Sequence, residues 1–274
     1  MTNAQQYVIR GGIEGRERLR ILSRVMHEAS HSLLDRLELR EGMRCLDAGC
    51  GGGDMTTELA RRVGPTGKAI GIDRDQVKLE IASQEARDQN LNNVEYLATD
   101  INEACKSQEF DVVYARFLLT HLSDPLKMLR SFYDCLRPAG CIAVEDIDFS
   151  GHVSYPESPA FKRYQEFYCT VARRKGCEPD IGPRLPRLLK ESGFSDVQVS
   201  IVQPVALKGE AKLISPITLE NIAPAVLAEG LASEEEIDQL VRELYEFAAD
   251  ESTLASVPRI FQTWGRRPDT VSAA

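Results

Sequence analysis

Glycines and acidic residues recur in the first half of the chain at places where a nucleotide could be held. The run Asp47-Ala48-Gly49-Cys50-Gly51-Gly52-Gly53 joins an apolar stretch to a helical one, and glycines there let a ligand approach the backbone closely. Asp73 follows Gly53 by 20 residues, a spacing at which a carboxylate binds ribose hydroxyls. Asp100 is placed to accept a hydrogen bond from the exocyclic amine of an adenine. Together these signals predict a binding site for an adenosine group.

The acids beside the glycines narrow the choice of nucleotide. The dinucleotide fingerprint GxGxxG would require glycine at position 54, where Asp54 stands. Asp47 would repel a pyrophosphate, whereas it would attract an ammonium group. No GxxxxGK(S/T) run occurs, which excludes a P-loop. A ligand with ribose, adenine and an ammonium group but no phosphate is S-adenosylmethionine, and a nicotinamide dehydrogenase is the disfavoured alternative.

Alternating strands and helices must position these residues at one edge of a sheet. Apolar or alternating stretches predict the strands, at about 44–48, 68–72, 94–98, 110–114, 141–144, 194–204 and 259–265. Helical signals fall between most of them, at about 54–64, 75–88, 125–136 and 181–192. This pattern predicts a doubly wound α/β sheet of six or seven strands, with its ligands beyond the carboxyl ends of the parallel strands.

Segments outside this alternation are predicted to form a helical cap. An amphipathic helix runs from Glu14 to about Leu37, and Ser233 with Glu236 forms a capping box that opens a later helix. The expected divisions are an N-terminal cap segment 1–40, a core 41–205 with a helical insertion at about 150–180, a lid insertion 206–256, and a last core strand with the tail 257–274.

Several motifs resemble a known family when they are taken as a set. CLDAGCGGGDMT, AIGIDRD, YLATDI, FDVVYARFLLTHLSDP and LRPAGCIAVED are similar to the successive motifs of class I S-adenosylmethionine-dependent methyltransferases, in the small-molecule branch with UbiE-like or type 11/12 domains. The resemblance is close over about residues 40–148, and IGPRLPRLLKESGFSDVQV resembles the family's late helix and sixth strand. It implies a Rossmann-like doubly wound seven-stranded sheet with helical cap insertions.

The resemblance also implies roles for single residues. Asp47, Gly49 and Gly51 would line the methionine end, Asp73 would bind the ribose, and the backbone near Arg116 would lie by the methionine amino group. The N-terminal helix would close over the cofactor, with Arg18 as a partner for the methionine carboxylate. The cofactor-binding residues expected are Tyr7, Arg18, Asp47, Gly49, Cys50, Gly51, Asp73, Arg74, Thr99, Asp100, Ile101 and Arg116.

The sequence identifies catalytic residues less clearly than cofactor-binding ones. Methyl transfer from a sulfonium is an in-line displacement, which requires mainly that the reactants are aligned and that water is excluded. A base is needed only where the acceptor atom arrives protonated. The candidates near the strand ends are His121, which is expected to open a helix, Glu145 and Asp146. An acidic pair at 145–146 would suit an amine acceptor, while capping or core roles are the structural alternatives.

The lack of motifs found in nucleic-acid methyltransferases favours a small organic molecule as the methyl acceptor. Amino-methylating nucleic-acid enzymes of this fold carry (D/N/S)PP(Y/F) after the fourth strand, where this chain has Asp111-Val112-Val113-Tyr114, and no Pro-Cys nucleophile pair occurs. The net charge of −9 also disfavours nucleic acid. A quinone-type C-methyltransferase is one alternative, and a non-catalytic S-adenosylmethionine-binding module is the alternative from another class.

Two further patterns allow more than one interpretation. His27-Glu28-Ala29-Ser30-His31 matches the zinc motif HExxH, but neither His121 nor His152 stands at a recognised metalloprotease spacing, so no metal is expected. An aromatic stripe at 161, 164, 167 and 168 is either the core of an inserted helix or the wall of an apolar acceptor pocket.

The remaining features bear on location. Seven scattered cysteines without a CxxC pair predict neither a disulfide framework nor a cysteine zinc site. No apolar run approaches the ~18 residues of a spanning helix, and the first residues do not form a secretory signal. We therefore expect a cytoplasmic protein, and leave open whether it is a monomer or a homodimer.

Overall fold

Seven strands form the central sheet of the computed structural model, which describes residues 12–100 and 108–269. Their order is β3-β2-β1-β4-β5-β10-β7. Strands β1 to β5 are parallel, and β10 runs antiparallel to both of its neighbours. The bounds are β1 (Arg44–Ala48), β2 (Lys68–Asp73), β3 (Val94–Ala98), β4 (Phe110–Arg116), β5 (Leu136–Asp148), β7 (Ser195–Val202) and β10 (Arg259–Arg266). The predicted doubly wound seven-stranded fold is confirmed.

Helices cover both faces of this sheet. They are α1 (Gly12–Asp35), α2 (Asp54–Val63), α3 (Gln76–Asp88), α5 (Pro125–Cys135) and α7 (Leu185–Glu191). Cys45 and Leu46 are neighbours on β1 and therefore point to opposite faces. Cys45 joins a core with α2 and the second half of α1, whereas Leu46 joins a core with α5 and α7. Local caps fix two helix starts, because Asp75 and Asp124 accept hydrogen bonds from backbone N–H groups three residues later.

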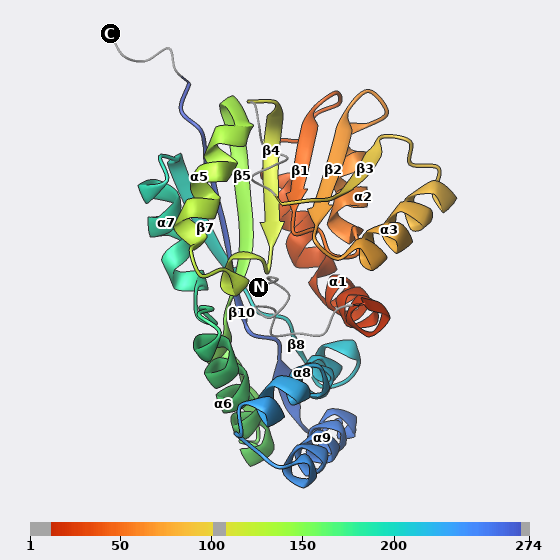
Figure 1. The fold of residues 1–274 in the computed structure, drawn as a ribbon, viewed down its shortest axis with the longest axis vertical. Helices are drawn as coiled ribbons and strands as arrows, with labels where there is room; N and C mark the ends of the chain where they lie inside the picture. Colours follow the sequence, from red (N-terminus) through yellow and green to blue (C-terminus); the bar gives the residue numbers. More distant parts are fainter. Residues whose placement is uncertain (1–11, 101–107, 270–274) are drawn as a thin grey trace.

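A third core lies beyond the carboxyl ends of the parallel strands, where α6 (Pro159–Arg174), α8 (Glu210–Ala228) and α9 (Glu234–Ala249) gather (Figure 1). The first half of α1 packs there through Ile21 and Leu22, which are both buried. Ser233 accepts a hydrogen bond from the Glu236 N–H at 3.2 Å, as the capping box predicts. We call these three helices, with the first half of α1, the cap.

Three short strands inside the cap segments were not predicted. They are β6 (Ser154–Tyr155), β8 (Val205–Ala206) and β9 (Leu254–Ser256), and they form a separate antiparallel sheet. Strands of two or three residues are too short to leave a period-2 pattern, and their pairing joins distant parts of the chain. Helix α8 also left a weak signal, because it contains Pro216 and Pro224, residues that normally end a helix.

Two local predictions at the fourth and fifth strands are corrected. His121 ends a 3₁₀ turn (Leu119–His121) and does not open a helix; the helix starts at Pro125, behind the Asp124 cap. Strand β5 continues to Asp148, so Glu145 and Asp146 lie within a strand that pairs on both sides and do not follow its end. The pairing with β10, which is antiparallel and comes 110 or more residues later, extends β5 past the expected stop.

The cysteines depart from expectation at one position. Cys135 is disulfide-bonded, whereas the free cysteines among the described residues are Cys45, Cys50, Cys141, Cys169 and Cys177. In the described part of the chain, none of the helices is long and apolar enough to cross a membrane.

Candidate active site

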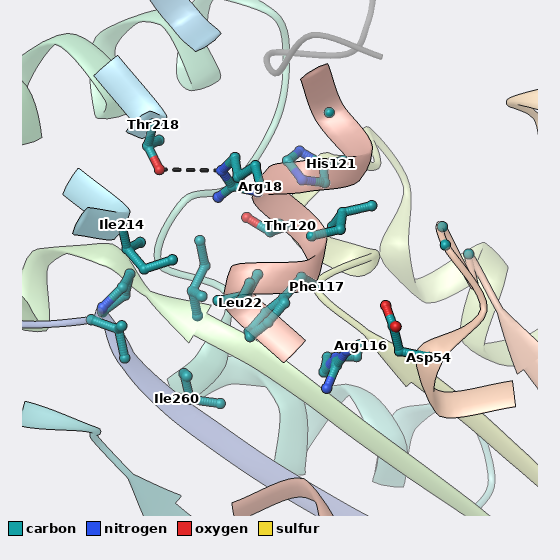
Figure 2. A pocket seen from close by; sticks show the side chains of 18 of the residues that line it. Arg18, Leu22, Asp54, Arg116, Phe117, Thr120, His121, Ile214, Thr218 and Ile260 are labelled. Carbon is teal, nitrogen blue, oxygen red and sulfur yellow. Dashed lines mark hydrogen bonds between the residues drawn. The ribbon is translucent and has the colours of Figure 1, made fainter. Parts of the chain in front are cut away.

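A cavity of about 1160 Å³, counted with the space open to solvent at its mouth, lies between the carboxyl edge of the sheet and the cap (Figure 2). The glycine-rich turn after β1 and the ends of β2 and β4 form one wall, and α1, α6 and α8 form the other. The position is the one at which an open parallel sheet binds its ligands. Lining side chains therefore come from segments as far apart as α1 and the residues just before β10.

The glycine-rich turn exposes bare backbone to the cavity. Gly49 and Gly51 have left-handed φ angles of 70° and 55°, which favour glycine. A Cβ on Gly49 would stand 2.9 Å from Cδ1 of Leu118, and one on Gly51 would stand 2.9 Å from Cδ1 of Leu19. Cys50 completes this wall, and burial raises the pKa of its thiol. The turn is thus shaped as a cradle that a side chain would fill.

Asp47 lies at the base of this cradle and is buried. Thr56 Oγ1 donates a hydrogen bond to its Oδ2 at 2.6 Å. Burial raises the pKa of Asp47 to about 6, while the Thr56 hydrogen bond and the charge of Arg116 act in the opposite direction. A cationic ligand group beside Asp47 would favour its ionised form, as predicted for the methionine ammonium.

Asp73 connects the cradle to a neighbouring hollow. Its Oδ2 accepts the Gly51 N–H at 2.9 Å, and its Oδ1 accepts the Asp75 N–H at 2.9 Å. Gly49 and Asp73 line both hollows, so the two adjoin. The residues expected at the adenine line the second hollow: Arg74, Thr99 and Asp100, with Arg74 and Asp100 forming an ion pair. The structure therefore brings together the ribose and adenine residues predicted from sequence.

The remaining predicted cofactor residues do not lie together with those at the ribose and adenine positions. Arg116, at the end of β4, lines the cavity and donates to Ser30 Oγ at 3.2 Å. Arg18 lies on the cap side, where its Nε donates to Thr218 Oγ1 at 3.2 Å (Figure 2). Tyr7 and Ile101 lie outside the described residues.

Of the three catalytic candidates, His121 lines the cavity. Burial, with smaller contributions from the charges of Arg18 and Lys78, lowers the pKa of His121 to about 4, so the ring is neutral near pH 7. A neutral imidazole offers both a donor and an acceptor nitrogen.

Glu145 and Asp146 do not line this cavity, and their oxygens accept hydrogen bonds in the core. Glu145 accepts from Ser30 Oγ at 2.8 Å and from Gln262 Nε2 at 3.1 Å. Asp146 accepts from the backbone N–H groups of Thr120 at 3.1 Å and Ile147 at 2.9 Å. Burial raises the pKa of both carboxyls, that of Asp146 to about 7. These contacts tie β5 to α1, β10 and the 3₁₀ turn.

The aromatic stripe of α6 divides between its two interpretations. Tyr164 and Tyr168 line the cavity, while Phe161 and Phe167 belong to the cap core without lining it. The Phe149 ring stacks on Tyr168 with centroids 3.8 Å apart. Sequence reasoning missed several other lining residues: Lys78, Phe117, Ile214, Thr218, Val257, Pro258 and Ile260. Only Phe117 carries a local signal of strain, since a left-handed φ of 55° is rare for a bulky residue, and this conformation is invisible in the sequence.

The HExxH residues lie on α1, where the His27 and His31 ring centroids are 3.8 Å apart. His31 Nδ1 stands 3.5 Å from Glu58 Oε1. Among the residues that the structure describes, no group of three or more potential metal ligands occurs.

Comparisons with known proteins agree with this geometry. Residues 39–192, more than half of the chain, match the family described as methyltransferase domain. The chain is 28% identical over 184 residues to a demethylmenaquinone methyltransferase of Lactobacillus johnsonii, covering 60% of this chain and 73% of that protein. It is 33% identical over 190 residues to a 2-phytyl-1,4-naphtoquinone methyltransferase of Thermosynechococcus vestitus, covering 63% and 81%.

A solved structure shares the fold. Phosphoethanolamine N-methyltransferase 2 of Haemonchus contortus, in complex with phosphomonomethylethanolamine and S-adenosylhomocysteine, superposes with a TM-score of 0.57 at 17% identity. The superposition covers 91% of this chain and 56% of that one. At this identity the likeness concerns the fold alone.

Proposed function

Because the chain belongs to the methyltransferase-domain family, as a class I S-adenosylmethionine-dependent enzyme, we propose that it methylates a small, largely apolar acceptor held under the cap. One observation carries the proposal. A single cavity runs from the backbone cradle at Gly49 and Gly51 to the tyrosines of α6, so a methyl group presented at the cradle would face an acceptor under the cap. We further propose that the enzyme works in the cytoplasm.

The residues present fit S-adenosylmethionine. We assign the methionine end to the cradle, with Asp47 facing the ammonium group and the backbone near Arg116 beside it. Asp73 keeps lone pairs for ribose hydroxyls after accepting its two backbone N–H groups. Arg74, Thr99 and Asp100 would frame the adenine, and Cys50 would contribute its backbone.

When bound, S-adenosylmethionine supplies an electrophilic methyl group. A carbon, oxygen or nitrogen atom of the acceptor forms the new bond to the methyl carbon, and the electrons of the broken sulfur–carbon bond remain on sulfur. The chain's own contribution is to align the acceptor and to exclude water, for which the cap is suited. Phe149, Tyr164 and Tyr168 form an aromatic wall that would hold a flat acceptor.

His121 is our candidate for handling an acceptor proton. It lines the cavity, and its lowered pKa leaves it neutral and able to accept a hydrogen bond from an acidic hydroxyl. Glu145 and Asp146, whose oxygens are already engaged in the core, would act through the position of β5 and Thr120. A reduced quinone is the second candidate acceptor, because the relatives carry quinone names and the cavity wall is aromatic.

The test is transfer of a labelled methyl group to a panel of phenols, amines, aromatic acids and reduced quinones. We expect transfer to at least one flat acceptor, and a His121→Gln variant to lower turnover of a hydroxyl acceptor while it binds S-adenosylhomocysteine normally. A protein that binds S-adenosylhomocysteine yet transfers nothing to any member of the panel would favour the non-catalytic binding module.

A further inference from the structure

Three cationic side chains of the described residues line the cavity, and their surroundings differ. Lys78 Nζ stands 3.3 Å from Asp75 Oδ2. Arg116 lies close enough to Glu145, Asp47 and Asp54 for their charges to act on it. Among the side chains that the structure describes, those of residues 15–100 and 108–269, none is an acidic partner of Arg18.

The surroundings of Arg18 are apolar and aromatic. Its Nε donates to Thr218 Oγ1 of α8, and the phenols of Tyr164 and Tyr168 lie near the guanidinium. Burial lowers the pKa of the guanidinium, yet an arginine stays protonated in proteins. The side chain is half-buried and lines the cavity. Removing a cation from water without a counterion is costly, so a ligand that brought an anion there would relieve the cost.

Arg18 also lies away from the residues assigned to the methionine end. Figure 2 shows it beside Thr218 and His121, while Asp54 lies across the cavity. The cation near Asp47 and Asp54 is the other arginine that lines the cavity, Arg116. The expectation that Arg18 pairs with the methionine carboxylate therefore fits the geometry less well than a contact with the acceptor.

We propose, on the basis of the methyl transfer proposed above, that Arg18 and Thr218 form a carboxylate subsite, so that the acceptor is a flat apolar acid. Nε of Arg18 is engaged by Thr218, and its two Nη groups keep four N–H donors, enough for bidentate binding of a carboxylate. The aromatic wall would hold the ring of the acceptor. Anchoring one end in this way would fix the distance from its nucleophilic atom to the cofactor edge.

The experiment compares two ligands that differ in charge. 1-Hydroxy-2-naphthoate and its neutral amide, 1-hydroxy-2-naphthamide, are titrated by calorimetry into the full chain saturated with S-adenosylhomocysteine. The variants are Arg18→Gln and Arg18→Lys. Arg24→Gln is the matched control, because Arg24 joins the same two helices through Glu210 at 2.6 Å and does not line the cavity.

We expect the wild type and the Arg24→Gln control to bind the naphthoate at least tenfold more tightly than the naphthamide. Arg18→Gln should abolish that preference, Arg18→Lys should keep part of it, and both should bind S-adenosylhomocysteine within about threefold of the wild type. If Arg18→Gln instead weakens S-adenosylhomocysteine tenfold or more, Arg18 binds the methionine carboxylate and the inference is overturned.

Two other outcomes separate this inference from the function on which it rests. A wild type that binds S-adenosylhomocysteine but shows no preference for the naphthoate, or binds neither naphthalene, overturns the carboxylate subsite alone. A folded wild type that does not bind S-adenosylhomocysteine overturns the proposed function, and the subsite with it.

Discussion

The two ends of the cavity are built in different ways. The end that we assign to the cofactor consists mainly of a glycine-rich turn and acids at successive strand ends, from one stretch between Asp47 and Asp100. The acceptor end is made of side chains from α1, α6, α8 and the approach to β10. The first end relies on backbone shape and local sequence, and the second on the packing of distant helices. Changes at one end should therefore leave the other largely intact.

The largest expected effect on binding is at the cofactor end. Asp73→Ala removes the carboxylate that holds the Gly51 N–H and is assigned to the ribose. We expect S-adenosylmethionine binding to weaken by about 1.5–3 kcal/mol, the scale of hydrogen bonds to a charged group. Calorimetry against Asp88→Ala, an exposed acid at the end of α3, provides the control. An unchanged affinity would remove Asp73 from the ribose role.

In the cap, at the acceptor end, we expect a substitution to lower the free energy of unfolding by a comparable amount without changing the affinity for the cofactor. Lys212 is 1% exposed, and its Nζ donates to the carbonyls of Leu207, Asp250 and Thr253 at 2.6–3.1 Å. Lys212→Met should lower the free energy of unfolding by about 1–3 kcal/mol, since those carbonyls lose a charged donor.

Urea denaturation measures this change, and Lys208→Met, at a 76% exposed lysine on the same segment, is the matched control. S-adenosylhomocysteine affinity should stay within about twofold of the wild type in both variants. A loss of cofactor affinity as large as that of Asp73→Ala would show that the two ends are not independent.

The pH dependence of cofactor binding probes Asp47. Its pKa is raised to about 6 in the free protein, mainly by burial, and a bound ammonium group would favour the ionised form. Affinity should be constant between pH 7 and 8 at this site and fall by up to tenfold per pH unit below about 6, because the carboxyl must lose a proton to bind. Calorimetry from pH 5 to 7 tests this, and Asp47→Asn should flatten the curve. A flat curve in the wild type contradicts the assignment.

The smallest expected effect concerns His152 in the cap. Both ring nitrogens are buried and have no hydrogen-bond partner within the part of the chain that the structure describes, and burial lowers the pKa of the ring to about 3. His152→Phe should raise the free energy of unfolding by about 1 kcal/mol at pH 7, because it removes these nitrogens.

The gain should grow as the pH falls from about 6.5 toward 3, since the unfolded histidine takes up a proton there and the folded one does not. Thermal unfolding at pH 7 and pH 5 measures it. His27→Phe, on the exposed face of α1, provides the control. An equal gain at both pH values, or a loss at pH 5, would show that His152 is protonated in the folded protein.

The sequence predicts the residues of the cofactor end better than those of the acceptor end. The reason is again that the first end is built from local sequence and the second from the packing of distant helices. That Asp47, Gly51 and Asp73 lie together could be predicted, because they stand at or just after the ends of β1 and β2, and parallel strands bring their carboxyl ends together. Thr218 could not, because its role depends on how α8 packs against α1. Glu145 and Asp146 looked like strand-end acids until the late strand β10 extended β5 beyond them.

The most direct test of the central claim, that the cofactor end is an S-adenosylmethionine site formed by this chain itself, is a calorimetric titration with S-adenosylmethionine, S-adenosylhomocysteine and NAD. The account predicts micromolar binding of the first two and none of NAD. A folded protein that binds NAD, or binds neither sulfur compound, would contradict it.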